Sequence, residues 1–103
     1  FHSLSNEYYQ VDGDRGVGET YVIGISTAEA DGQKMDGMVG GRYLDKFERR
    51  KGVWRSSHRL FVMDWNMNFP ATAEWEEGMY GQIRTHGQRD HSDPVFKLWE
   101  SLT

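Results

Sequence analysis

The chain has 103 residues, with 12 basic and 16 acidic side chains and a formal net charge of -4. This acidic balance gives no overall attraction for nucleic acids or anionic membranes, and the absence of cysteine excludes a disulfide framework and a thiolate metal site. The length predicts a single domain over residues 1–103. Its 4 Trp, 5 Tyr, 5 Phe and 5 Met require a deep core, a ligand cavity or a partner subunit.

The chain shows no targeting or membrane signal. No apolar run is long enough to span a bilayer, and no charged-then-apolar signal peptide opens the sequence. We therefore expect a cytoplasmic protein without a membrane or nucleic-acid partner. His86 and His91 match no metal-binding spacing with the aspartates near them, so no metal and no cofactor is expected.

The first half of the chain predicts two strands. The first covers residues 1–11 and ends at Asp12-Gly13, a pair that supplies the positive φ of a tight hairpin turn. The second covers residues 16–27 and contains "ETYVIGIS", which is rich in β-branched and aromatic residues. Residues 28–37 are polar with two glycines and predict a flexible loop.

Two further strands follow as a hairpin. Residues 38–50 and 53–65 are alternating runs around Lys51-Gly52. In the second of these runs, alternation places two sets of side chains on opposite faces. One set is Trp54, His58, Leu60 and Val62, and the other is Arg59, Phe61, Met63 and Trp65. Both faces are partly apolar, so we expect each to be covered and the chain to form a homo-oligomer.

The last third of the chain predicts only short helices. A helical turn is expected over residues 71–77, closed by Gly78, within a long irregular segment. A C-terminal helix is expected after Ser92 or Asp93 as its cap, with Pro94 in its first turn. The predicted fold is α+β: a curved, mainly antiparallel sheet of about four strands with a C-terminal helix.

Residues 39–65, "VGGRYLDKFERRKGVWRSSHRLFVMDW", closely resemble the paired strands of the SnoaL-like family in the nuclear transport factor 2-like superfamily. That family includes scytalone dehydratase and hexachlorocyclohexane dehydrochlorinase. "HSLSN" and "VDGDRGVGETY" match its preceding strands, and "GQRDHSDPVF" matches its tail. The resemblance implies a cone in which helices pack into a strongly curved sheet around a cavity, and dimers that form through the sheet. It implies that this chain is the sheet half of the cone, without the N-terminal helices.

The resemblance also implies a catalytic residue. In the lyase members, a histidine at the position of His2 pairs with an acidic residue of an N-terminal helix and removes a proton. His2 is therefore the candidate base, and a frayed terminus is the alternative. Asn6 is four residues further on and is expected on the same strand face, beside the imidazole. An amide that satisfies a strand edge is the alternative for Asn6.

Four further residues are candidates for substrate binding. Arg59 matches a cavity-facing arginine of the dehydrochlorinases, which would stabilise a departing halide or a developing anion. The alternative is a surface arginine that shields apolar area with its stem. Phe61 and Met63 are expected to share its wall, and His58 to face away. Gly41, with Gly40, permits close approach of a ligand or helix, a bulge or sharp curvature.

Two functions remain open at this point. The first is a cofactor-free lyase or isomerase, of the dehydratase or dehydrochlorinase type, that acts on a small apolar cyclic molecule. His2 would be its base, and Asn6 and Arg59 would polarise the substrate. The second is a non-catalytic ligand-binding or dimerisation module of the same fold. The charged side chains of the third strand, Asp45 among them, are expected to form a solvated or cross-strand-paired face.

Overall fold

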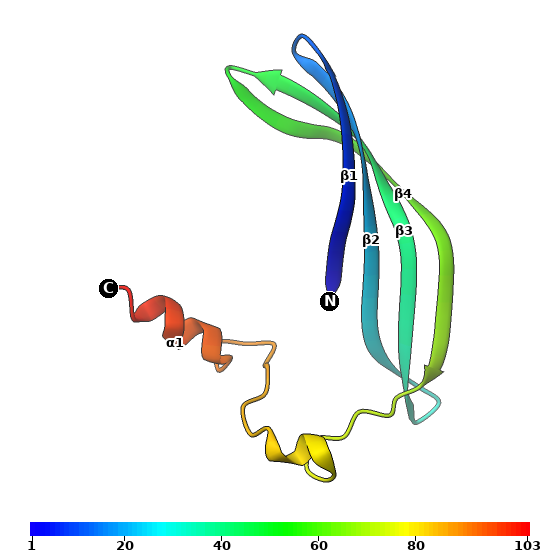
Figure 1. The fold of residues 1–103 in the computed structure, drawn as a ribbon, viewed down its shortest axis with the longest axis vertical. Helices are drawn as coiled ribbons and strands as arrows, with labels where there is room; N and C mark the ends of the chain where they lie inside the picture. The colour runs from blue at the N-terminus through cyan, green and yellow to red at the C-terminus, as the bar shows by residue number, and fades with distance from the viewer. The chain divides into compact units, whose positions relative to one another are not determined.

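A computed structural model describes residues 1–103, and the chain divides into two compact units, Phe1–Ala71 and Thr72–Thr103. The first unit is an antiparallel sheet in the order β1-β2-β3-β4, so each strand pairs with its neighbours in sequence (Figure 1). Its strands are β1 (His2–Asp12), β2 (Arg15–Ala30), β3 (Gln33–Arg50) and β4 (Val53–Pro70). The four predicted strands and their antiparallel order are thus confirmed.

The strands are joined by two-residue turns. Gly13 has a φ of 61°, as the Asp12-Gly13 signal predicts. Lys51 and Gly52 both have positive φ, 52° and 78°, which is the backbone of a type I′ hairpin. The predicted loop over residues 28–37 is wrong. β2 and β3 continue through this segment, because Asp31-Gly32 forms a third tight turn, with φ values of 51° and 76°.

The sheet is open and is not strongly curled, in contrast to the strongly curved sheet expected from the resemblance. β1 and β4 form its two edges. A sheet closes into a barrel only when its two edge strands pair with each other. Here each strand pairs only with its neighbours in sequence, so β1 and β4 do not pair.

Three β-bulges interrupt the alternation of side chains. The extra residues are Asn6 in β1, and Ser57 and Asp64 in β4. Each bulge moves the residues beyond it to the other face of the sheet relative to a regular strand. The prediction from simple alternation is therefore wrong for Trp54, which lies across the Ser57 bulge from His58, and for Trp65, which lies across the Asp64 bulge from Met63.

The register defines the two faces of the sheet. We call one the Arg59 face; near its centre it carries Tyr43, Asp45, Arg59, Phe61 and Met63. We call the other the His58 face; it carries Val17, Leu44, His58, Leu60 and Trp65. Paired residues of antiparallel strands point to the same side, so each set shares one surface.

The sheet has little apolar core of its own. Val22, 5% exposed, is its buried apolar side chain, and the polar residues Thr20 and Asp45 are also buried on the central strands. Large apolar side chains are exposed on both faces, for example Met63 on the Arg59 face and Leu60 on the His58 face. The expectation that both faces are partly apolar is confirmed.

The second unit contains a 3-10 helix, η1 (Met79–Gln82), and a helix α1 (Pro94–Glu100). The predicted helical turn over residues 71–77 is wrong: the turn of helix begins after Gly78 instead of ending there. Gly78, with a φ of 68°, is the N-cap of this turn and not the residue that ends it. α1 agrees with the prediction, with Pro94 in its first turn and Asp93 accepting a hydrogen bond from the Val95 amide at 2.9 Å. No helix is both long and apolar enough to cross a membrane.

Candidate ligand-binding site on the Arg59 face

Asp45 and Arg59 form a two-bond ion pair between the central strand β3 and the edge strand β4. They lie directly opposite each other in the register. Nε of Arg59 donates to Oδ1 of Asp45 at 2.8 Å, and Nη2 donates to Oδ2 at 2.9 Å. Two parallel hydrogen bonds between a guanidinium and a carboxylate fix both the position and the plane of the arginine head group.

The two partners differ in their access to water. The Asp45 side chain is 3% exposed, whereas the Arg59 side chain is 52% exposed. Hydrogen bonding to Asp45 raises the pKa of Arg59 above its ordinary value, against a smaller opposing effect of desolvation. Arg59 therefore stays positively charged at physiological pH and offers part of its head group to solvent.

Aromatic rings surround the arginine head group. Cζ of Arg59 lies 4.0 Å from the centroid of the Tyr43 ring, within cation–π range. Tyr43 in turn packs against Phe61, with 5.7 Å between ring centroids. These residues come from adjacent rows of the β3–β4 pair, so regular strand geometry beyond the Ser57 bulge holds them together.

Gly18 brings a further ring toward the same surface. It lies between Tyr9 and Asp45 in one row of cross-strand partners. A Cβ atom at Gly18 would lie 2.6 Å from Cδ1 of Tyr9 and 3.0 Å from Cε2 of Phe47. The glycine therefore lets these two rings, whose centroids are 5.9 Å apart, close over the middle of the sheet.

Gly41, Phe61 and Met63 meet on this face, and Phe61 and Met63 share it with Arg59 as predicted from the alternation of side chains. Met63 is the cross-strand partner of Gly41, and a Cβ atom at Gly41 would lie 2.8 Å from Cε2 of Phe61. It would also collide with the carbonyl oxygen of Val62. Phe61 and Met63 remain 43% and 57% exposed. Three of the predicted site residues thus form one apolar surface, with the cation of Arg59 at its side.

His2 lies on the same face but far from this group. Its partner on β2 is Gly24, and Cδ2 of its ring lies 3.3 Å from the position of a Cβ there. Asp45 pairs with Gly18, six residues away along β2, which corresponds to roughly 20 Å at ~3.3 Å per residue. No ion pair joins His2 to a carboxylate. The structure therefore does not bring His2 and Arg59 together.

Asn6 does not share a face with His2. It is the extra residue of the β1 bulge and has a φ of 39°, in the left-handed region that asparagine tolerates better than most residues. It lines a hollow of about 450 Å³ with Ser5, Tyr21 and Trp65, which belong to the His58 face. The expected position beside the imidazole is wrong, because the bulge breaks the alternation between residues 2 and 6.

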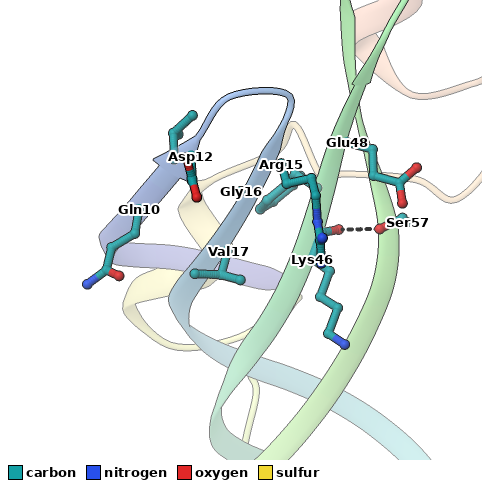
Figure 2. A pocket seen from close by; sticks show the side chains of 10 residues that line it. Gln10, Asp12, Arg15, Gly16, Val17, Lys46, Glu48 and Ser57 are labelled. Carbon is teal, nitrogen blue, oxygen red and sulfur yellow. Dashed lines mark hydrogen bonds between the residues drawn. The ribbon is translucent and has the colours of Figure 1, made fainter.

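Two more hollows open on the His58 face. The one in Figure 2, of about 450 Å³, is lined by side chains of both charges: the cations of Arg15 and Lys46 and the carboxylates of Asp12 and Glu48. At its edge the bulge residue Ser57 donates a hydrogen bond to the Lys46 carbonyl at 3.2 Å (Figure 2). These balanced charges favour neither a cationic nor an anionic ligand.

His58 lies in the second of these hollows, which has a volume of about 410 Å³. The hollow is mostly apolar and contains Tyr8, Leu44 and Leu60. His58 therefore faces away from Arg59, and the prediction for this residue is confirmed.

Arg42 on the His58 face has a structural role. It donates to both carboxylate oxygens of Asp64, at 3.0 and 3.1 Å, and to Glu19 at 3.2 Å. The hydrogen bonds to Asp64, and then to Glu19, raise its pKa. The predicted cross-strand pairing of the third strand's charges is thus confirmed for Arg42.

Asp45 is the site residue that sequence reasoning missed. It was expected on a solvated or cross-strand-paired charged face. Its pairing with Arg59 confirms the second alternative, but its side chain is only 3% exposed and lies on the opposite side of the sheet from Arg42. Its place opposite Arg59 depends on the Ser57 bulge, since an unbroken register from the Lys51-Gly52 turn would place it opposite His58. No group of three or more His, Asp or Glu side chains is arranged to hold a metal ion.

The Arg59 face of this open antiparallel sheet thus presents a half-exposed arginine, paired with a buried carboxylate, beside exposed aromatic and apolar side chains. The family comparison is more specific. The SnoaL-like domain model matches residues 1–60, more than half of the chain, and the chain belongs to this family. No curated protein and no solved structure matches the chain.

Proposed function

We propose that this chain is a SnoaL-like small-molecule-binding protein whose ligand, a small apolar ring compound, lies on the Arg59 face. The half-exposed guanidinium of Arg59, fixed in plane by a buried carboxylate, is the observation that carries this proposal. Phe61 and Met63 supply exposed apolar contact area beside it. Gly41 lets the Phe61 ring lie close to the backbone of β3 on this face.

The binding site is tested by titrating 2-acetylnaphthalene, an uncharged ring compound, into the isotopically labelled full chain and following amide shifts by NMR. We expect the largest shifts near Phe61 and Met63. Phe61→Ala should weaken binding by about tenfold, because half of a phenylalanine's burial is worth roughly 1.4 kcal/mol.

Leu60→Ala is the matched control, because Leu60 is the neighbouring residue, is similarly exposed at 53% against 43%, and lies on the opposite face. It should change the affinity by less than twofold. Equal losses for the two variants, or shifts confined to the His58 face, would place the ligand elsewhere.

A lyase or isomerase with His2 as base is the catalytic form of this proposal. Family membership and the position of His2 on the Arg59 face support it. The separation of roughly 20 Å along the strand direction is too large for both residues to contact one single-ring molecule. The geometry of this chain therefore favours the binding module over the lyase.

Proton abstraction separates the two forms. A histidine base would speed the exchange of the ring α-protons of 2-tetralone in deuterated water, which NMR detects directly, and His2→Ala would remove the acceleration. For a binding module we expect no acceleration by either protein. An acceleration that disappears in His2→Ala would establish the catalytic form.

Dimerisation through the His58 face is the second candidate function. A continuous apolar area near the end of the sheet supports it, because exposed patches of this kind mark interaction sites. The area consists of Ile23, Ile25, Trp65, Met67 and Phe69, each at least 39% exposed.

Sedimentation velocity tests this candidate. We expect the wild type to sediment as a dimer and Met67→Glu as a monomer. Asn66→Glu, a charge at the neighbouring residue on the other face, should leave the dimer intact. A wild type that sediments as a monomer at high concentration would remove this candidate.

A further inference from the structure

The Asp45–Arg59 pair carries two opposite charges within hydrogen-bond distance, at 2.8 and 2.9 Å. Because Asp45 is buried and has Arg59 as its ion-pair partner, its negative charge is screened little by water. A group that approaches Arg59 therefore meets a nearly neutral pair and not an isolated cation. An anionic ligand would be attracted by the guanidinium and repelled by the carboxylate beneath it.

The remaining donors of Arg59 are nevertheless free to bind. The two hydrogen bonds to Asp45 use Nε and Nη2 and leave Nη1 unused. The Tyr43 ring covers one face of the guanidinium at 4.0 Å, and the side chain is 52% exposed. The open edge is thus an oriented hydrogen-bond donor, which suits an uncharged acceptor such as a carbonyl oxygen.

The geometry assigns Asp45 as the specificity-determining residue of the Arg59 face: it orients Arg59 as a hydrogen-bond donor and cancels its charge, so that the site selects uncharged ring compounds over anionic ones. Asp45 acts through Arg59 and has no contact with the ligand itself. This inference rests on the proposed ligand site. It adds the charge class of the ligand and the residue that determines this class.

Two probes with the same ring system test the inference: 2-acetylnaphthalene, which is uncharged, and 2-naphthoate, which is anionic. By isothermal titration, the wild type should bind the ketone at least tenfold more tightly than the carboxylate. Asp45→Asn leaves the charge of Arg59 uncompensated and its orientation less fixed. It should weaken ketone binding and strengthen naphthoate binding, shifting the ratio of dissociation constants by at least tenfold.

Opposite changes for the two probes exclude a purely structural effect, because partial unfolding would weaken both. A naphthoate affinity that is unchanged or lower in Asp45→Asn would overturn the inference while leaving the ligand site in place. If the wild type binds neither probe, the proposed function fails, and this inference fails with it.

The double variant Asp45→Asn/Arg59→Gln keeps the inference testable if Asp45→Asn does not fold, since it contains no unpaired charge. It removes both charges at once, so naphthoate binding should change by less than threefold from the wild type. A loss of naphthoate affinity above tenfold would show that Arg59 acts as an uncompensated cation, contrary to the inference. The ketone should bind the double variant more weakly, because the oriented donor is lost.

Discussion

Removal of either partner of the Asp45–Arg59 pair should destabilise the sheet, but by unequal amounts. Asp45 is 3% exposed, so replacing its partner leaves a carboxylate without a counter-charge and without water. Breaking a buried pair in this way costs about 3–5 kcal/mol. Arg59→Met keeps the length of the side chain that covers Asp45. We expect a loss of about 3 kcal/mol, at the lower end because the pair is partly open to solvent.

Asp45→Asn leaves Arg59 without its ion-pair partner. The Arg59 side chain is 52% exposed and can be hydrated when the carboxylate is lost. The asparagine oxygen can still accept one hydrogen bond. The expected loss is therefore only about 1–2 kcal/mol, the value for one hydrogen bond to a charged group.

Urea denaturation measures both losses. Trp54 and Trp65 lie in β4 and report its unfolding by fluorescence. With a denaturant slope of about 1–3 kcal/mol per molar, Arg59→Met should lower the midpoint by roughly 1–3 M and Asp45→Asn by about half as much. In a double-mutant cycle the combined loss should be smaller than the sum of the single losses. Equal losses, or a larger one for Asp45→Asn, would refute the argument from burial.

Three further changes test the backbone and the helix cap. Gly41→Ala should cost about 1–3 kcal/mol, because its methyl group would collide with the Val62 carbonyl, whereas Gly37→Ala, whose nearest contact is 3.3 Å away, should cost less in the same urea assay. Gly32→Ala should cost about 1–2 kcal/mol in thermal unfolding, since its φ is 76°. Hydrogen bonds from two backbone amides lower the pKa of Asp93 from 3.8, so its capping contribution is present above pH 3.8 and is lost as the pH falls through the lowered pKa. The capped amide should shift by NMR in that window, and Asp93→Asn should abolish the shift.

Each of these three predictions would be contradicted by a specific result. If Gly41→Ala is no worse than Gly37→Ala, the carbonyl of Val62 moves aside at little cost. An unchanged melting temperature for Gly32→Ala would mean that the turn relaxes to a negative φ. A capped amide that still shifts below pH 3.8 in Asp93→Asn would assign the titration to another carboxylate.

The sequence determined the sheet topology to a large extent. The turns that contain Gly13 and Gly52 were readable because glycine after a polar residue satisfies the positive φ of a tight hairpin. The same signal at Asp31-Gly32 was obscured by polar neighbours, and two strands were consequently predicted too short. α1 was predictable from local chemistry, because its cap and first-turn proline act within a few residues of the helix start.

The tertiary structure alone decided which side chains meet. A single extra residue in a strand moves every residue beyond it to the other face of the sheet. The local sequence did not predict the bulges at Asn6, Ser57 and Asp64. The bulge at Asn6 removed this residue from the face that carries His2. The bulge at Ser57 placed Asp45 opposite Arg59. Residue types therefore specified the strands and the chemistry that each can carry. Register, which depends on hydrogen bonds between strands far apart in sequence, specified the site.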